Sequence, residues 1–191
     1  YINKTFIKEF TDADGTSIKV GFISVCVPSN PKMYVSYTDM HKEAKASYES
    51  LKDKTDVIFG LTHVKVSDDK KILEALPNIP LIMGGHEHNN MLVPVGNSTI
   101  AKADANAKTV YIHRLTFNPP SGMLQIQSSL KKIDDSIPND PSTQKVVDRW
   151  QSKVDNLMSD MGFDPNRELL TLSQPLICKE AWVRTRPTNF G

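Results

Sequence analysis

The chain has 191 residues, with 23 Lys and Arg against 22 Asp and Glu, so its formal net charge is +1. This balance argues against a nucleic-acid-binding protein, which shows a basic excess or stripe. The longest apolar run, 20–27, is far shorter than the ~20 residues that a membrane span needs. The two cysteines, Cys26 and Cys178, can pair or stay free.

The first part of the chain shows alternating strand and helix patterns. We expect, in chain order, strands at 2–10 and 17–27, a helix from Thr38 or Asp39 to Lys52, a strand at 56–62, a helix capped by Ser67 or Asp68, and a strand at 80–83. The first two strands flank a turn at 12–15 and predict a hairpin. The later elements follow a βαβαβ order, which implies parallel strands with right-handed crossovers. The predicted fold class is α/β.

The second part of the chain has a different pattern. Four further strands are expected at 91–95, 98–103, 109–117 and 123–133, separated by turns, as in an antiparallel meander. A polar linker over 134–141 then precedes an amphipathic helix at 142–161 that ends at Gly162. We expect the apolar face of this helix to pack against a sheet or a neighbouring domain.

Three of the five histidines follow two of the predicted parallel strands. His63 comes after the strand at 57–61, and His86 and His88 follow the next strand within Gly-Gly-His-Glu-His. Parallel strands end at one edge of the sheet, where open α/β sheets bind ligands. Because neutral imidazole is a common ligand for metals such as zinc, these three residues are predicted metal ligands. The alternative is that they are polar loop residues without a metal.

The remaining candidates have ordinary structural explanations. Glu87 lies between two predicted ligands, and we expect it to point away from the metal, toward solvent or toward a group behind the site. His41 falls in the first turn of a predicted helix, and His113 lies within a predicted strand. Neither is expected to take part in chemistry.

Two segments resemble a known family. Residues 56–63 are similar to the D-x-I-x-x-L-T-H block of calcineurin-like metallophosphoesterases, and residues 81–88 to their G-G/N-H-x-H block. The 5′-nucleotidase branch is the most similar. Residues 183–191 resemble the R-x-x-E-T-N-L-G opening of that branch's C-terminal, nucleoside-binding domain, although Pro187 replaces the usual Glu and Phe190 the usual Leu.

The resemblance implies an architecture. Residues 1–133 would form the second half of a metallophosphoesterase β-sandwich flanked by helices, with the βαβαβ part followed by the meander. Residues 134–163 would be a linker helix, and 164–191 the start of the C-terminal domain. The family's D-x-H, G-D and G-N-H blocks would precede this chain. We therefore expect strands 20–27 and 57–61 to leave a large hydrophobic surface uncovered.

The resemblance also implies a chemistry. His63 and His86 would bind one ion and His88 the other, in a site for two divalent metals such as zinc or manganese. The whole protein would hydrolyse nucleotide phosphomonoesters, while the isolated chain, without a bridging carboxylate or an assigned catalytic residue, would be inactive. The alternatives are a 2′,3′-cyclic nucleotide phosphodiesterase, another phosphoesterase of this fold, or a non-catalytic module that binds a metal or a partner. The branch implies a periplasmic, secreted or cell-surface location.

Overall fold

A mixed sheet begins with the hairpin that the sequence predicts. In the computed structural model, β1 (Thr5–Thr11) pairs antiparallel with β2 (Ser17–Cys26). Gly15 closes the turn between them with a φ of +88°, a conformation that glycine adopts without a steric cost. The structure describes residues 3–164, 167–168, 170–177 and 180–189.

The parallel part of the sheet follows the predicted βαβαβ order. Strands β2, β3 (Val57–His63) and β4 (Leu81–Gly84) are parallel neighbours. Helix α1 (Met40–Leu51) connects the first pair, and α2 (Val66–Ala75) connects the second. The predicted α/β class is confirmed.

The four later strands form two separate hairpins rather than one continuous meander. Strands β5 (Met91–Val95) and β6 (Ser98–Lys102) pair antiparallel, and β6 also pairs parallel with β4. The six-stranded sheet therefore has the order β1-β2-β3-β4-β6-β5. Strands β7 (Thr109–Asn118) and β8 (Met123–Lys132) form a two-stranded sheet of their own. The free backbone groups along β4 explain this arrangement, because the largely buried strand β6 pairs with them.

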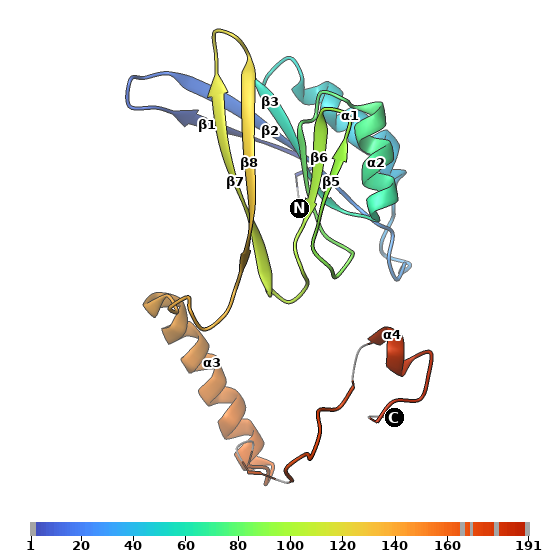
Figure 1. Cartoon of the computed structure of the whole chain (residues 1–191), viewed down its shortest axis with the longest axis vertical. Coiled ribbons are helices and arrows are strands. Elements are labelled where there is room, and N and C mark those ends of the chain that lie inside the picture. The colour runs from blue at the N-terminus through green and yellow to red at the C-terminus, as the bar shows by residue number, and fades with distance from the viewer. Residues whose placement is uncertain (1–2, 165–166, 169, 178–179, 190–191) are drawn as a thin grey trace. The chain divides into compact units, whose positions relative to one another are not determined.

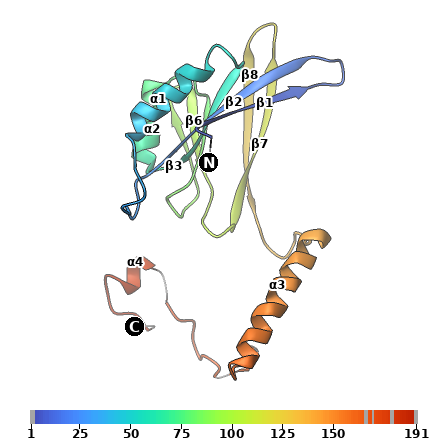
Figure 2. The same ribbon diagram turned by 180° about the vertical axis from the view of Figure 1, so that it is seen from behind.

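The two faces of the six-stranded sheet are covered by different layers. Figures 1 and 2 show α1 and α2 together on one face, and the β7–β8 hairpin beside the other. Alternate residues of β2 serve the two layers: Ile23 belongs to the helix-side cluster and Val20 to the hairpin-side cluster. Tyr111, Leu124 and Ile126 of the hairpin pack against that second cluster.

The prediction that β2 and β3 leave a large hydrophobic surface uncovered was wrong for most of their apolar residues. Val20, Ile58 and Phe59 are buried, because the helices and the β7–β8 hairpin cover these strands, while Leu61 is exposed, at 42%. The exposed apolar side chains near this region lie on the edge strand β1, and they are Phe6, Ile7 and Phe10.

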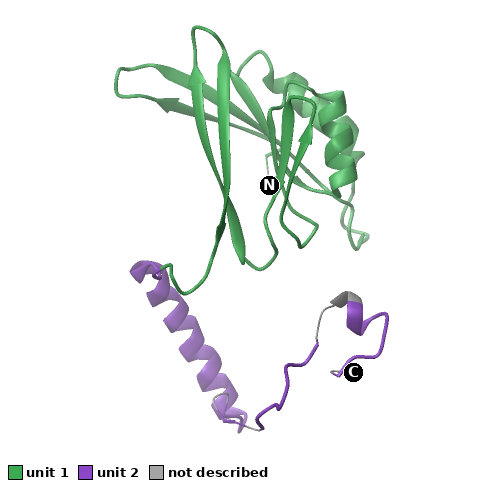
Figure 3. Cartoon of the chain, in the orientation of Figure 1, with its two compact units in different colours: residues 1–137 green, residues 138–191 purple. Residues whose placement is uncertain are grey.

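The chain divides into two compact units, residues 1–137 and 138–191 (Figure 3). The second unit contains α3 (Pro141–Asp160), which matches the predicted helix, and the short α4 (Glu180–Val183). Gly162 ends α3 with a φ of +81°. Most apolar side chains of α3 are exposed, among them Trp150 at 56%. No helix among the described residues is long and apolar enough to cross a membrane.

Candidate metal site

Two of the predicted ligands lie at the carboxyl ends of neighbouring parallel strands. His63 is the last residue of β3 rather than a loop residue, and His86 follows β4 by two residues. Their ring centroids lie 5.6 Å apart at an interplanar angle of 82°. This edge-to-face arrangement places the imidazoles of two strands side by side, as the sequence predicts for these two residues.

Glycine at position 85 makes this pairing possible by leaving room. The Gly85 N–H donates to the Thr62 carbonyl at 2.9 Å, which holds the backbone close to the end of β3. A Cβ on Gly85 would lie 3.0 Å from His63 Nδ1. Gly85 does not have a positive φ. The space that it leaves for the imidazole, and not a left-handed turn, therefore explains glycine at this position.

The backbone strain of this loop falls on His86 itself. Its φ is +88°, which is unusual for a residue with a side chain. Such conformations cost about 1–3 kcal/mol and persist where the surrounding structure enforces them, often at functional sites. The half-buried His86 is thus held in a conformation that glycine would adopt more readily.

His88 is exposed at the far end of the same loop, and its carbonyl accepts a hydrogen bond from Ala105 N at 3.3 Å. Among the residues that the structure describes, no group of three or more His, Cys, Asp or Glu side chains is arranged to hold a metal ion. The chain therefore pairs His63 with His86, and the role of all three histidines as ligands stays a prediction. The donor set of imidazoles fits zinc in chemical type, whereas manganese favours oxygen ligands beside them.

Glu87 is neither solvated nor free. Its Oε1 accepts a hydrogen bond from Val66 N, and its Oε2 lies 2.5 Å from Lys102 Nζ. Burial raises the pKa of this carboxyl, but the hydrogen bonds from Lys102 and Val66 outweigh that effect, so the pKa lies below its ordinary value. Glu87 is therefore anchored as a carboxylate against the groups behind the loop.

The cap of α2 also differs from the prediction. The helix begins at Val66 after Lys65, whose side chain makes no capping hydrogen bond. Glu87 supplies the acceptor instead, from 21 residues along the chain. The predicted caps are displaced: Ser67 and Asp68 lie within the first turn.

Lys102 is the residue near this site that sequence reasoning missed. Its side chain is fully buried, and Nζ contacts Glu87 Oε2, the Val64 carbonyl at 2.6 Å and Asp69 Oδ2 at 2.8 Å. Burial raises the pKa of Asp69, and Lys102 offsets part of that effect. The sequence does carry one signal for this lysine, because it stands at the end of a predicted strand. If such a lysine is buried, its charge needs acidic partners nearby.

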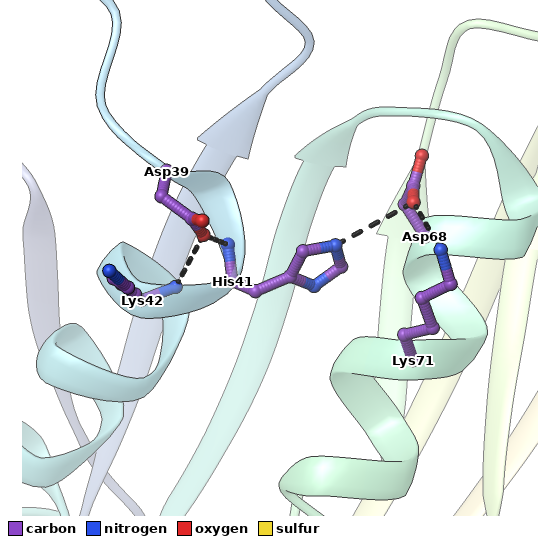
Figure 4. Close-up of polar contacts among 5 residues, drawn as sticks. All are labelled: Asp39, His41, Lys42, Asp68 and Lys71. Atoms are coloured by element: carbon purple, nitrogen blue, oxygen red, sulfur yellow. Dashed lines mark hydrogen bonds and ion pairs between the residues drawn. The ribbon is translucent and has the colours of Figure 1, made fainter.

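His41 and its neighbours make structural contacts (Figure 4). Although Asp39-Met40-His41 has a D-x-H spacing, the Asp39 carboxylate caps α1 by accepting from His41 N and Lys42 N. The His41 ring lies 3.6 Å from Asp68, which also pairs with Lys71 at 3.3 Å. These contacts link the starts of α1 and α2.

His113 lies in β7, as predicted. Its Nδ1 lies 2.8 Å from Ser128 Oγ on β8, and its ring stacks on Tyr111. Burial lowers the pKa of His113. Cys26 is a free, exposed cysteine at the end of β2, whereas Cys178 lies outside the described residues.

Sequence comparisons match this chain to known phosphoesterases. In an alignment of 160 positions that covers 72% of the chain, the sequence is 24% identical to human 5′-nucleotidase, and the match covers 28% of that protein. A second stretch of 75 residues, 38% of the chain, is 31% identical to the uncharacterised metallophosphoesterase YunD of Bacillus subtilis and covers 16% of it. The chain thus spans less than a third of the length of these curated relatives. No protein-family model matches.

A structural comparison agrees with the sequence matches. The NAD nucleotidase of Haemophilus influenzae superposes with a TM-score of 0.58, covering 81% of this chain and 42% of that one. At 15% identity this likeness shows a common fold.

Proposed function

We propose that this chain belongs to the metallophosphoesterase family of the 5′-nucleotidases, on the basis of its sequence matches, and that it supplies histidine ligands to a dinuclear metal site. His63 and His86 bind one divalent ion, and His88 binds the other. The ions are zinc or manganese. The whole protein hydrolyses nucleotide phosphomonoesters.

The observation that carries this proposal is the 5.6 Å pairing of the His63 and His86 rings at the ends of two parallel strands. Open α/β sheets bind their ligands at this edge. Gly85 and the anchored Glu87 hold the loop in the conformation that keeps the two rings together. The two imidazoles come from different strands, so their approach depends on the fold rather than on local sequence.

When bound, two divalent ions would supply an activated water and charge stabilisation for the phosphoryl oxygens. This chain's contribution is to hold neutral imidazoles at fixed positions. In the proposal, the bridging carboxylate and the catalytic acid or base come from parts of the protein other than the described residues. We therefore expect no turnover by the 191-residue chain alone.

The nucleotide substrate is proposed from relatives that carry the names 5′-nucleotidase and NAD nucleotidase. The domain assignment is proposed on the same basis: residues 1–133 belong to the metallophosphoesterase domain, 134–163 to a linker helix, and 164–191 to the start of a nucleoside-binding domain. We also propose a periplasmic, secreted or cell-surface location, by resemblance to this branch.

The test uses the full-length protein and alanine variants of His63, His86 and His88, with His41→Ala as the matched control. Turnover of a nucleoside monophosphate, a 2′,3′-cyclic nucleotide and an aryl phosphate is measured in Mn²⁺, and Mn²⁺ affinity by calorimetry. We expect each ligand variant to lose at least about 100-fold in turnover, the upper end of what outer partners of a metal site cost. The control should retain its turnover.

The substrate profile and the binding data separate the alternatives. A preference for the 2′,3′-cyclic nucleotide would identify that compound, and not the nucleoside monophosphate, as the substrate. Mn²⁺ binding without any turnover would support a non-catalytic module. Near-normal turnover by both His86→Ala and His88→Ala would overturn the metal assignment.

A further inference from the structure

Three contacts join the loop at 86–90 to one short segment, residues 102–105. Lys102 Nζ pairs with Glu87 Oε2 at 2.5 Å. Ala105 N donates to the His88 carbonyl at 3.3 Å. The carboxylate of Asp104 accepts from Asn90 N at 2.9 Å and from Asn90 Nδ2 at 2.8 Å. The contacts fall on successive parts of the loop, so they fix it along its length.

The contact made by Lys102 is buried. The lysine side chain has an exposed fraction of 0%, and that of Glu87 is 22%. Asp69 and the Val64 carbonyl also lie against the ammonium group, so its position is fixed from three sides. An ion pair in such surroundings depends strongly on both partners, since removal of one leaves a buried charge.

The Lys102 side chain passes directly beside Gly84, where a larger residue would obstruct it. A Cβ at Gly84 would lie 2.9 Å from Lys102 Cε and 3.0 Å from Thr62 Oγ1. The glycine therefore leaves the space through which Lys102 reaches Glu87. The two glycines before His86 have separate roles: Gly84 makes room for Lys102 and Gly85 makes room for His63.

Asp104 is itself held in place. Thr109 Oγ1 donates to its Oδ2 at 2.8 Å, and Asp104 N donates to Thr109 Oγ1 at 2.9 Å. The start of β7 thus fixes the carboxylate that holds Asn90. Segment 102–105 is anchored on both sides, by β6 pairing with β4 and by this link to β7.

We infer that Lys102 and Asp104 are positioning residues for the metal-binding loop, acting on His86 and His88 through Glu87 and Asn90. The inference rests on the proposed function for the identity of the ligands. Neither residue touches metal or substrate. Their role is to fix the backbone of residues 86–90 so that the two imidazoles are presented in one geometry.

The experiment compares four variants of the full-length protein: Lys102→Met, Asp104→Ala, Ile100→Val, and Lys102→Met combined with Glu87→Gln. Ile100 is buried on the same strand, so Ile100→Val controls for lost packing. Hydrogen exchange of peptides covering 84–90 is measured in metal-free protein by mass spectrometry. Mn²⁺ affinity is measured by calorimetry, and stability by thermal unfolding.

We expect Lys102→Met and Asp104→Ala each to speed loop exchange and to weaken Mn²⁺ binding by about 10–100-fold, as for other partners that orient metal ligands. Ile100→Val should lower stability without either effect. The double variant removes the unpaired charge at position 87 but leaves the buried Asp69 without its partner, so its thermal stability should recover only in part relative to Lys102→Met. Its Mn²⁺ affinity should stay low, because the loop is still not held.

A purely structural role predicts otherwise. Recovery of Mn²⁺ affinity together with stability in the double variant would overturn the positioning role, as would unchanged loop exchange in both Lys102→Met and Asp104→Ala. Failure of the unaltered protein to bind Mn²⁺ would overturn the proposed function itself, while the exchange measurement in metal-free protein would still decide whether segment 102–105 holds the loop.

Discussion

Gly85 lies so close to His63 that a single added methyl group would reach 3.0 Å from the imidazole Nδ1. The glycine belongs to the loop that carries His86, whereas the histidine ends the neighbouring strand. The end of β3 and the loop after β4 therefore meet where the His63 ring contacts the backbone of Gly85. Any side chain at position 85 has to displace the ring.

Replacement of Gly85 by alanine should therefore displace the His63 ring. The matched control is Gly21→Ala, whose Cβ would meet Thr55 at 3.1 Å; Gly21 pairs with Ile58, five residues before His63 on β3. We expect both variants to lose about 1–3 kcal/mol of stability through overpacking. Only Gly85→Ala should also shift the His63 ring resonances and weaken Mn²⁺ binding. Equal effects of both variants on the ring would contradict this assignment.

The positive φ of His86 gives a prediction about stability. His86→Gly and His86→Ala both remove the imidazole, but only alanine keeps a Cβ in the strained conformation. We expect the glycine variant to be more stable than the alanine variant by about 1 kcal/mol, in spite of its more flexible unfolded state. Chemical denaturation of the two variants measures the difference. A more stable alanine variant would show that this backbone is not strained.

Asp140 should make the start of α3 sensitive to acid. Hydrogen bonds from the Ser142 hydroxyl and the Thr143 N–H lower its pKa from 3.8 to about 2. Because the folded pKa lies below the unfolded one, the stabilisation is complete above pH 3.8 and is lost as the pH falls through about 2. The Thr143 amide resonance, followed by NMR, should shift over this window.

Asp140→Asn is the control for this titration, because asparagine keeps the capping acceptor without an ionisable group. The Thr143 resonance should then be independent of pH below 4. A titration that persists in Asp140→Asn would assign the change to another carboxyl.

His113 gives a second pH dependence, in the first unit. Burial lowers its pKa from the ordinary 6.5, so the unfolded chain takes up a proton more readily than the folded one. The contribution of His113 to stability is therefore complete above pH 6.5 and is lost as the pH falls through the lower folded value. Denaturation midpoints of the unaltered protein and of His113→Gln should diverge over this range. Parallel pH profiles would contradict the assignment.

Local sequence patterns predicted the elements that depend on local chemistry. Asp39 before an apolar stripe predicted the start of α1, and Gly162 predicted the end of α3. The continuous apolar run at 57–61 predicted a buried parallel strand. These features depend on residues a few positions apart, and the structure has them where the sequence places them.

Contacts between distant residues could not be read in the same way. The pattern of residues 98–102 identifies a strand, but not that β6 pairs with β4 instead of extending a meander. The cap of α2 comes from Glu87, and the burial of Lys102 depends on partners 15 to 38 residues away. The sequence predicts the candidate site because His63 and His86 each come shortly after an apolar run. It does not predict the supporting contacts of Glu87 and Lys102, because their partners are distant in the chain.

The insertion of β6 between β4 and β5 has a consequence for the order of folding. Glu87 and Lys102 are only 15 residues apart in the chain, and the hairpin between them brings them together. Closing a short loop costs little chain entropy, and contacts of low sequence separation form quickly. The contact between Glu87 and Lys102 can thus form as soon as β6 has folded, whereas the contact between Asn90 and Asp104 gains its support from Thr109 only when the start of β7 is present.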